Sequence, residues 1–108
     1  MSKVGIDIVK LSRLNNVKEG FVLHVLSREE IEIYNTYTDS RKKEYLGGRF
    51  AAKEAIIKCL SGIEIPNMND IVILNNEVGK PIVTYKDYKI EVSISHEDEY
   101  AVAIAIME

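Results

Sequence analysis

The stretch RKKEYLGGRFAAKEAIIKCL, residues 41–60, decides the fold that we predict for this chain of 108 residues. At about 100° per residue its apolar side chains cover almost the whole circumference of a helix, so the helix must lie mostly inside the protein. Gly62 follows it and supplies the left-handed backbone that commonly ends helices. The polar exceptions are a narrow strip of Gly47, Glu54, Lys58 and Ser61, and a neighbouring pair, Arg49 and Lys53. We therefore expect a central buried helix whose few polar residues carry the chemistry.

Upstream of this helix the sequence predicts one strand and two shorter helices. Residues 4–9 alternate with a period of two, which is typical of a half-buried strand, and Asp7 lies on the face opposite the apolar side chains Val4, Ile6 and Ile8. From residue 19 to residue 37 the apolar spacing becomes helical. A capping box at S27–E30 starts a new helix there, so two helices fit better than one.

Downstream of Gly62 the pattern predicts four strands that pair as hairpins. They are expected at Ile71–Leu74, Ile82–Tyr85, Ile90–Ser95 and Tyr100–Ile106. One strand, two or three helices and then an antiparallel meander indicate an α+β fold, and the length indicates a single domain over residues 1–108.

Composition narrows the function classes. Residues 1–60 hold 11 basic and 8 acidic side chains, whereas residues 61–108 hold 3 and 9. This is far from the basic stripe of a nucleic-acid binder, although it allows a local patch for an anionic cofactor or an acidic protein. The single Cys59 favours a reducing compartment, and no signal peptide or membrane-spanning run is visible. We expect a cytoplasmic protein that binds neither nucleic acid nor membranes.

Two groups of charged residues have an ordinary and a chemical interpretation. Glu54 and Lys58, four residues apart on a helix, are most often a solvated ion pair that contributes little. Asp7 in an apolar strand is often only a solvent-facing acid. What favours chemistry is the combination of G5-x-D7 with the run GRFAAKEAIIK, residues 48–58.

These two stretches resemble the paired motifs of the phosphopantetheinyl transferase superfamily, a Gly-x-Asp strand and a Trp/Phe-x-x-Lys-Glu-Ala/Ser-x-x-Lys helix. Further matches to its short, holo-acyl-carrier-protein-synthase branch are GIDI at 5–8 leading to Arg13, GKP at 79–81, and VSISH at 92–96 followed by Tyr100 and Ala101. The four motifs cover most of the chain in the right order. The resemblance implies transfer of the phosphopantetheine arm of coenzyme A to a serine of apo-acyl carrier protein, in fatty acid biosynthesis.

The resemblance also implies roles for individual residues. Asp7 and Glu54 would hold Mg²⁺ against the pyrophosphate, as suits a hard cation that prefers oxygen ligands. Lys58 would neutralise phosphate charge with a part in proton transfer, which makes Asp7, Glu54 and Lys58 the catalytic group. Whether Glu54 or a metal-bound water accepts the serine proton stays open.

The remaining cofactor contacts implied by the resemblance lie in three segments. Arg49 and His96 would meet the adenosine 3′-phosphate, because cationic donors suit phosphate oxygens. Lys53 would belong to the cofactor-binding group, and the turn Gly79-Lys80-Pro81 would lie near the adenine. The loop at residues 62–66 is shorter and poorer in glycine than is usual in the family, which puts backbone contacts to phosphate there in doubt.

Docking of the carrier protein would depend on a thin set of basic residues. The family often has an Arg- and Lys-rich segment after the position of Arg13, but residues 15–21 here are nearly neutral. Docking is therefore expected to use Lys10, Arg13, Lys18 and Arg28.

We also expect a homotrimer with sites at subunit boundaries. A small domain has little interior, and residues 100–106 are apolar on both faces, so their alanine side needs cover from a helix or another subunit. The short branch of the family is trimeric. Two alternatives remain at this stage, a noncatalytic binder of an acidic carrier or nucleotide and a purely structural α+β module. Transfer of the arm to an apo-carrier separates the enzyme from both.

Overall fold

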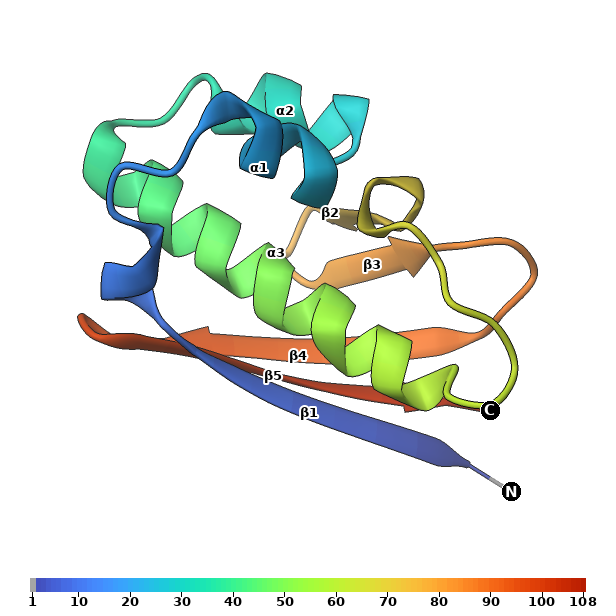
Figure 1. Cartoon of the computed structure of the whole chain (residues 1–108). Helices are drawn as coiled ribbons and strands as arrows, with labels where there is room; N and C mark the ends of the chain where they lie inside the picture. Colours follow the sequence, from blue (N-terminus) through green and yellow to red (C-terminus); the bar gives the residue numbers. More distant parts are fainter. Residues whose placement is uncertain (1) are drawn as a thin grey trace.

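The computed structural model describes residues 2–108 and shows a long helix lying across a three-stranded antiparallel sheet (Figure 1). In chain order the elements are β1 (Lys3–Lys10), the short 3-10 helix η1 (Leu11–Leu14), α1 (Glu19–Val25), α2 (Arg28–Tyr34), α3 (Asp39–Cys59), the 3-10 helix η2 (Met68–Asp70), β2 (Val72–Asn75), β3 (Pro81–Thr84), β4 (Ile90–His96) and β5 (Tyr100–Met107). This arrangement confirms the predicted α+β class. The expected helices and strands are present, with ends that differ by up to three residues.

The main sheet has the order β1-β5-β4, so the last strand of the chain lies in its centre. β5 pairs with β1 from Lys3↔Met107 to Lys10↔Tyr100, and with β4 along the hairpin from residue 90 to residue 96. β2 and β3 form the other predicted hairpin, which makes a separate two-stranded sheet. The expected meander is therefore divided between two sheets, and the N-terminal strand closes the larger one.

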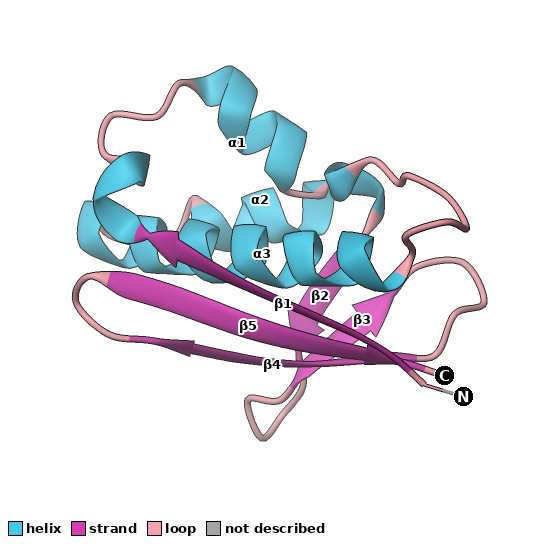
Figure 2. Ribbon diagram, turned by 60° about the horizontal axis from the view of Figure 1, so that its bottom comes forward, coloured by secondary structure: helices cyan, strands magenta, loops and turns pink. Residues whose placement is uncertain are grey.

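Helix α3 lies between the main sheet and the remaining elements, with α1 and α2 on the side away from β1 and β5 (Figure 2). Helix α2 begins with the predicted capping box, in which the Ser27 hydroxyl accepts from the Glu30 amide and the Glu30 carboxylate accepts from the Ser27 amide. No helix within residues 2–108 combines the length and apolar character needed to cross a membrane.

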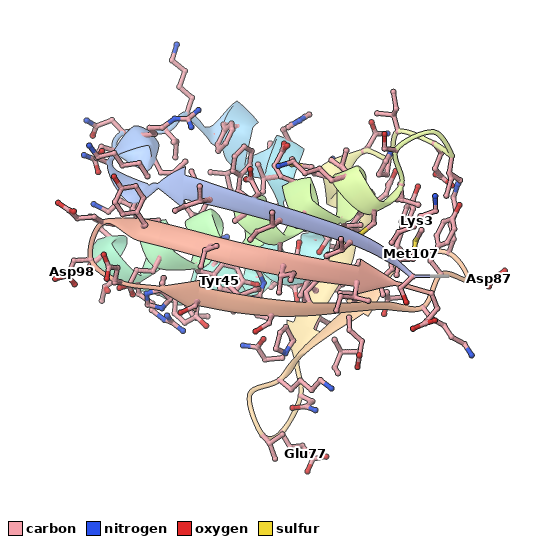
Figure 3. The ribbon with its side chains drawn as sticks, turned by 90° about the horizontal axis from the view of Figure 1, so that it is seen from below. Lys3, Tyr45, Glu77, Asp87, Asp98 and Met107 are labelled. Atoms are coloured by element: carbon pink, nitrogen blue, oxygen red, sulfur yellow. The ribbon has the colours of Figure 1, made fainter. Side chains whose placement is uncertain are left out.

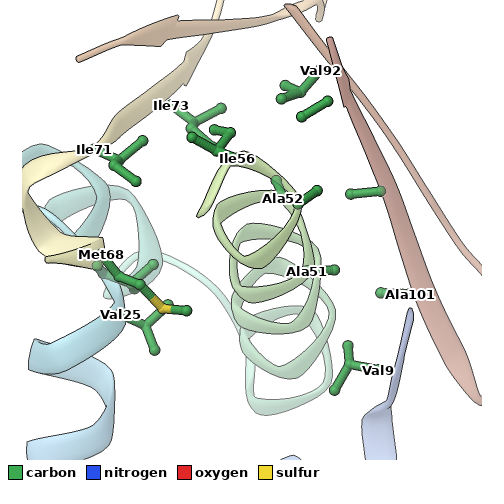
Figure 4. Packing of buried hydrophobic residues seen from close by; sticks show 14 of the residues in the cluster. Val9, Val25, Ala51, Ala52, Ile56, Met68, Ile71, Ile73, Val92 and Ala101 are labelled. Carbon is green, nitrogen blue, oxygen red and sulfur yellow. The ribbon is translucent and has the colours of Figure 1, made fainter. Parts of the chain in front are cut away.

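The hydrophobic core surrounds α3 on both sides. Ala51 and Ala52 of the helix are fully buried, with Val9 and Ala101 on the sheet side (Figure 4). Ala101, Ala103 and Ala105 of β5 face the helix, and their small side chains let α3 lie close to the sheet. Cys59 also belongs to this core, as expected. Its thiol donates to the Ala105 carbonyl at 3.4 Å, and burial raises the pKa of that thiol.

The face of the sheet that points away from α3 corrects one of our expectations. The apolar face of β1 is not the buried one: Val4, Ile6 and Ile8 are 64%, 58% and 60% exposed. The alanines of β5 are covered by α3, whereas Ile104 and Ile106 beside them point outward. Figure 3 views the sheet from this outer side, with α3 behind it. The face that lacks cover within one chain is therefore the isoleucine face.

Candidate functional site

The site begins where β1 touches α3 without a side chain between them. A Cβ added to Gly5 would lie 1.9 Å from the Ala55 carbonyl oxygen, so only glycine permits this contact. Further along the same strand, Val9 lies beside Gly47 of the helix. The strand and the helix thus run in opposite directions, and Asp7, midway between Gly5 and Val9, lies beside the helical turn that includes Glu54.

Asp7 and Lys58 are joined across this junction. The Lys58 ammonium lies 3.6 Å from a carboxylate oxygen of Asp7 and donates to the Ile6 carbonyl at 2.6 Å. The Asp7 side chain is 22% exposed and that of Lys58 is 53% exposed, so both can meet a ligand from outside. Glu54 lies one turn before Lys58 on the same side of α3 and is half-buried. The structure thus brings together Asp7 and Lys58, and Glu54 lies one helical turn from that pair.

The loop after α3 forms the wall next to Lys58. A hollow of about 400 Å³ lies there, lined by Ile57, Lys58, Ser61, Gly62, Glu64 and Ile65. Gly62 has a φ of 83°, as predicted for the residue that ends the helix. This short loop therefore shapes the space beside the Lys58 ammonium.

Glu64 fastens the same loop to the segment after β3, which sequence reasoning missed. Its carboxylate accepts from the hydroxyls of Tyr85 and Tyr88 and from the Lys86 ammonium. These hydrogen bonds, with that from Tyr85 the largest cause, lower the pKa of Glu64 to about 2. The sequence shows an acid in the loop, but only the tertiary structure brings the two tyrosines to it.

Lys53 is placed differently from our expectation. It was expected on the polar surface of α3 and in the cofactor-binding group, but its side chain is 0% exposed. Its ammonium donates to the Glu30 carboxylate and to the Val25 carbonyl at 2.7 Å. Its donors thus face protein groups in the interior. We correct the expected cofactor contact of Lys53, because a ligand at the surface cannot reach this ammonium.

Arg49 is also buried, which corrects its expected place on a polar surface. One guanidinium nitrogen donates to the Ile73 carbonyl and to the Asn75 side chain, each at 3.1 Å. The guanidinium carbon lies 4.5 Å from the centre of the Tyr45 ring, a cation–π distance. Burial raises the pKa of Tyr45 to about 12, against the opposing effect of the Arg49 charge. Arg49 therefore joins α3 to β2 and Tyr45.

The remaining predicted cofactor residues lie on two separate turns. His96, at the end of β4, has its Nδ1 atom 3.7 Å from a Glu44 carboxylate oxygen. In the β2–β3 hairpin, Gly79 has a φ of 85°, and the side chain of Asn76 accepts from the Lys80 amide at 2.9 Å. Residues 79–81 therefore lie in the turn of the β2–β3 hairpin and at the start of β3. Within one chain, His96 contacts Glu44 of α3, whereas the hairpin turn is held by Asn76 within the hairpin itself.

The four predicted docking residues are exposed but do not form one patch. Arg13 and Lys18 line a groove of about 550 Å³ together with apolar side chains, among them Phe21 and Phe50. Lys10 lies at the nearby end of β1. Arg28 lines a different hollow, beside α1 and η2, and so is separated from that groove.

No group of three or more His, Cys, Asp or Glu side chains within residues 2–108 is arranged to hold a metal ion. A site that uses Asp7 and Glu54 would therefore take its other ligands from substrate or water. Mg²⁺ commonly binds in that way.

Comparison with known proteins identifies the family of this chain. The model of the 4′-phosphopantetheinyl transferase superfamily matches residues 3–105. A holo-[acyl-carrier-protein] synthase of Mycoplasma mycoides is 45% identical over 109 residues, covering 100% of this chain and 96% of the relative. One from Geobacillus sp. is also 45% identical, covering 97% of this chain and 94% of that relative.

A solved structure shows that the fold is shared. The holo-(acyl-carrier-protein) synthase of Bacillus anthracis, in complex with CoA (3′,5′-ADP), superimposes with a TM-score of 0.89 at 35% identity, covering 98% of this chain and 95% of that one. These comparisons confirm the expected enzyme class. With a family match that spans nearly the whole sequence, this chain belongs to the 4′-phosphopantetheinyl transferase superfamily, in its holo-[acyl-carrier-protein] synthase branch.

Proposed function

We propose that this chain transfers the 4′-phosphopantetheine arm of coenzyme A to a serine of apo-acyl carrier protein, in a Mg²⁺-dependent step of fatty acid biosynthesis in the cytoplasm. The observation that carries the proposal is the contact between Gly5 and Ala55, which sets Asp7 beside the turn that holds Glu54 and Lys58. The substrates follow from the relatives, which are named as synthases of holo-acyl-carrier protein and include structures with coenzyme A.

Asp7 and Glu54 are the residues that would hold Mg²⁺. Both offer carboxylate oxygens, and both lie at the open junction of β1 and α3, where phosphate oxygens and water can complete the shell. The donor set therefore fits this cation. Bound there, Mg²⁺ would offset the negative charge of the pyrophosphate and of the transferring phosphoryl group.

Lys58 is suited to bind the same pyrophosphate from the helix side. Its ammonium is half-exposed and meets only one carboxylate at 3.6 Å, so its remaining donor capacity can turn toward phosphate oxygens. The charge would stabilise the transition state more than the ground state if it faces the oxygens on which charge develops. We assign Lys58 this role, with Asp7 and Ile6 holding its ammonium before substrate binds.

The reaction then moves one phosphoryl group between two oxygens. The carrier serine oxygen forms a bond to the β-phosphorus of coenzyme A, and the bond from that phosphorus to the bridging oxygen breaks. The bridging oxygen leaves with adenosine 3′,5′-bisphosphate, and phosphopantetheinyl-serine is formed. The Glu54 carboxylate is well placed to accept the serine proton, because it lies at the same open junction as Lys58.

The nucleotide end of coenzyme A would extend toward Arg49, His96 and the hairpin turn Gly79-Lys80-Pro81. His96 is partly exposed and Lys80 is exposed, so each can meet phosphate or base. Arg49 is buried by its β2 contacts, and its Nε atom is also buried and has no partner, so its proposed role toward the 3′-phosphate requires the guanidinium to turn outward when coenzyme A binds. We retain these five residues as the proposed nucleotide site.

The proposed docking site for the carrier protein is the groove near η1 and α1. Arg13 and Lys18 supply positive charge at its rim, and the Phe21 and Phe50 rings lie 5.6 Å apart within it. A surface with apolar centre and basic rim suits an acidic partner, since charge steers the encounter and apolar contact holds it. We assign Lys10 to the same site, whereas Arg28 lines a separate hollow and would contact a docked carrier protein outside this groove.

We further propose a homotrimer with active sites shared between subunits. The outward isoleucines form one continuous apolar strip, because Val4 pairs with Ile106 and Ile6 with Ile104 across the sheet. Exposed strips of this kind mark association surfaces. Mixing two inactive variants, Glu54→Ala and His96→Ala, should restore activity if each site takes these residues from different copies. A fully active monomer in sedimentation would contradict this assembly.

The enzyme is tested by the intact mass of an apo-acyl carrier protein after incubation with this protein, coenzyme A and Mg²⁺. We expect a mass increase of one phosphopantetheine arm, which disappears when Mg²⁺ is chelated or when the carrier serine is replaced by alanine. An unchanged carrier mass, with the protein folded and the carrier competent for a known synthase, would contradict the proposed function.

A further inference from the structure

Lys53 and Glu30 form a closed ion pair in the interior, away from the Asp7–Lys58 junction. Both side chains are 0% exposed, and the Lys53 ammonium also donates to the Val25 carbonyl at the end of α1. Burial lowers the pKa of Lys53, and the neighbouring Glu30 carboxylate opposes that shift. Removing two charges from water has a high cost, so a buried pair of this kind is poor support for stability alone.

The Glu30 carboxylate has a partner for each of its oxygens. Oε1 accepts from Lys53 and from the Ser27 amide at 2.8 Å, and Oε2 accepts from the Ile73 amide at 2.8 Å. Apolar side chains of similar volume would fill the same space, but they would leave the Ile73 amide without an acceptor. What this pair contributes and an apolar pair could not is the hydrogen bond that holds β2 at the Ile73 amide.

Arg49, one turn before Lys53 on α3, also binds β2. It donates to the Ile73 carbonyl and to the Asn75 side chain, so both backbone groups of Ile73 are bound by side chains from the helices. β2 pairs with β3 on one edge only. On its other edge, Glu30 and Arg49 take the place that a neighbouring strand would occupy.

β2 is the base of a hairpin that projects from the body of the molecule. Figure 3 shows Glu77 at its tip, away from the main sheet. The turn holds Gly79, Lys80 and Pro81, and Asn75 at its start is bound directly to Arg49. A small rotation of β2 at Ile73 would therefore be enlarged at the turn.

We infer that Glu30 and Lys53 are a positioning pair, which holds β2 at Ile73 and so sets the place of Arg49 and of the turn at residues 79–81 for the nucleotide end of coenzyme A. Neither residue touches the substrate. The inference rests on the proposed function for its ligand, but the grip on β2 is a property of the chain itself. It predicts that the pair affects nucleotide binding and leaves carrier docking unaffected.

The test uses Glu30→Met/Lys53→Met, which removes both charges together and avoids leaving one buried without a partner. Glu30→Gln/Lys53→Met is a second variant, because its one amide oxygen can accept from Ser27 or Ile73 but does not replace two carboxylate oxygens. Ser27→Ala is the matched control, since it removes the other half of the capping box and leaves the Ile73 contact intact.

Two measurements are made on each folded protein: calorimetric affinity for adenosine 3′,5′-bisphosphate, and hydrogen exchange at the Ile73 amide. In the double Met variant we expect roughly tenfold weaker binding, as follows from small displacements of a site, and loss of protection at Ile73. The Gln variant should be intermediate and Ser27→Ala unchanged. Steady-state assays should show a raised KM for coenzyme A with the KM for the carrier protein unchanged.

Two results would be decisive against the inference. A folded double Met variant with wild-type bisphosphate affinity would show that the pair does not position the nucleotide site. Unchanged Ile73 protection in that variant would show that it does not hold β2. If the wild-type protein itself bound no bisphosphate, the proposed function would fail, whereas the exchange measurement would still decide whether Glu30 and Lys53 hold the strand.

Discussion

The two sides of α3 carry the same chemical pair in opposite surroundings. Toward β1, Lys58 meets Asp7 at an open junction, where both side chains are partly exposed. Toward α2 and β2, Lys53 meets Glu30 in the interior, and each oxygen of that carboxylate already has a partner. The two lysines are five residues apart and hence about 140° apart around the helix. One motif thus supplies an open lysine, which is the proposed phosphate contact, and an enclosed lysine that binds other parts of the chain.

Removing a carboxylate from the open side should have the largest effect on activity. We expect Asp7→Ala and Glu54→Ala to lower transfer by roughly two to three orders of magnitude, since each removes a ligand that positions charge at the reacting phosphate. Stability should change by less than about 1 kcal/mol, because neither carboxylate is closed in the interior. Activity is measured by carrier mass at limiting Mg²⁺. Glu29→Ala removes the same charge from exposed α2 and should stay active, whereas near-normal activity in either site variant would refute the metal site.

Replacing each lysine by methionine tests the comparison directly through stability. Lys53→Met leaves the Glu30 charge buried without a partner and should lower the free energy of unfolding by about 3–5 kcal/mol. Lys58→Met removes a half-exposed partner and should change it by at most about 1 kcal/mol. Denaturant unfolding of both variants measures the difference. Equal losses would mean that the two sides are not distinct.

Gly5→Ala tests the contact that creates the open side. The added Cβ would meet the Ala55 carbonyl oxygen at 1.9 Å, so β1 must move away from α3. We expect a loss of about 1–3 kcal/mol of stability, as for other overpacked contacts, together with reduced activity because Asp7 moves with the strand. Gly20→Ala is the control. Its Cβ meets nothing within 4 Å in α1, so stability should rise by up to about 1 kcal/mol.

Acid should reduce the stability that Glu64 gives to the loop after α3, and this is the smallest effect that we predict. Because Glu64 has its pKa lowered from 4.5 to about 2, its contribution to stability is complete above about pH 4.5 and is lost as the pH falls toward 2. Glu64→Gln lacks this carboxylate. The difference in melting temperature between the wild-type protein and Glu64→Gln should therefore shrink over this pH range. A constant difference would show that the Glu64 cluster does not form in solution.

The helices, the strands and the residues of the open side could be predicted from the sequence, because they depend on local patterns. The capping box at Ser27 and the glycine at residue 62 are short-range signals, and the structure confirms both. Asp7, Glu54 and Lys58 follow from two motifs whose spacing is fixed by a strand and a helix. The motifs alone do not show that the strand and the helix lie side by side. The close approach of Gly5 to Ala55 shows this in the structure.

The closed side and the outer sheet face could not be predicted in the same way. Alternation in β1 separates two faces but does not say which one meets the helix, and here the face with Gly5 does because it permits close approach. Lys53 suggests a surface position until Glu30, 23 residues away, is brought to it. These outcomes depend on tertiary contacts, and no single-segment pattern records them.

The side chains that bind Ile73 also protect the chain against faulty association. A strand edge with free amides and carbonyls can pair with a strand of another molecule, which is a common start of aggregation. At the centre of β2 both groups are already occupied by Glu30 and Arg49. An incoming strand would have to displace a carboxylate that Lys53 also holds and a guanidinium that Asn75 also holds. The buried charges therefore block strand pairing at the edge of β2 that does not face β3.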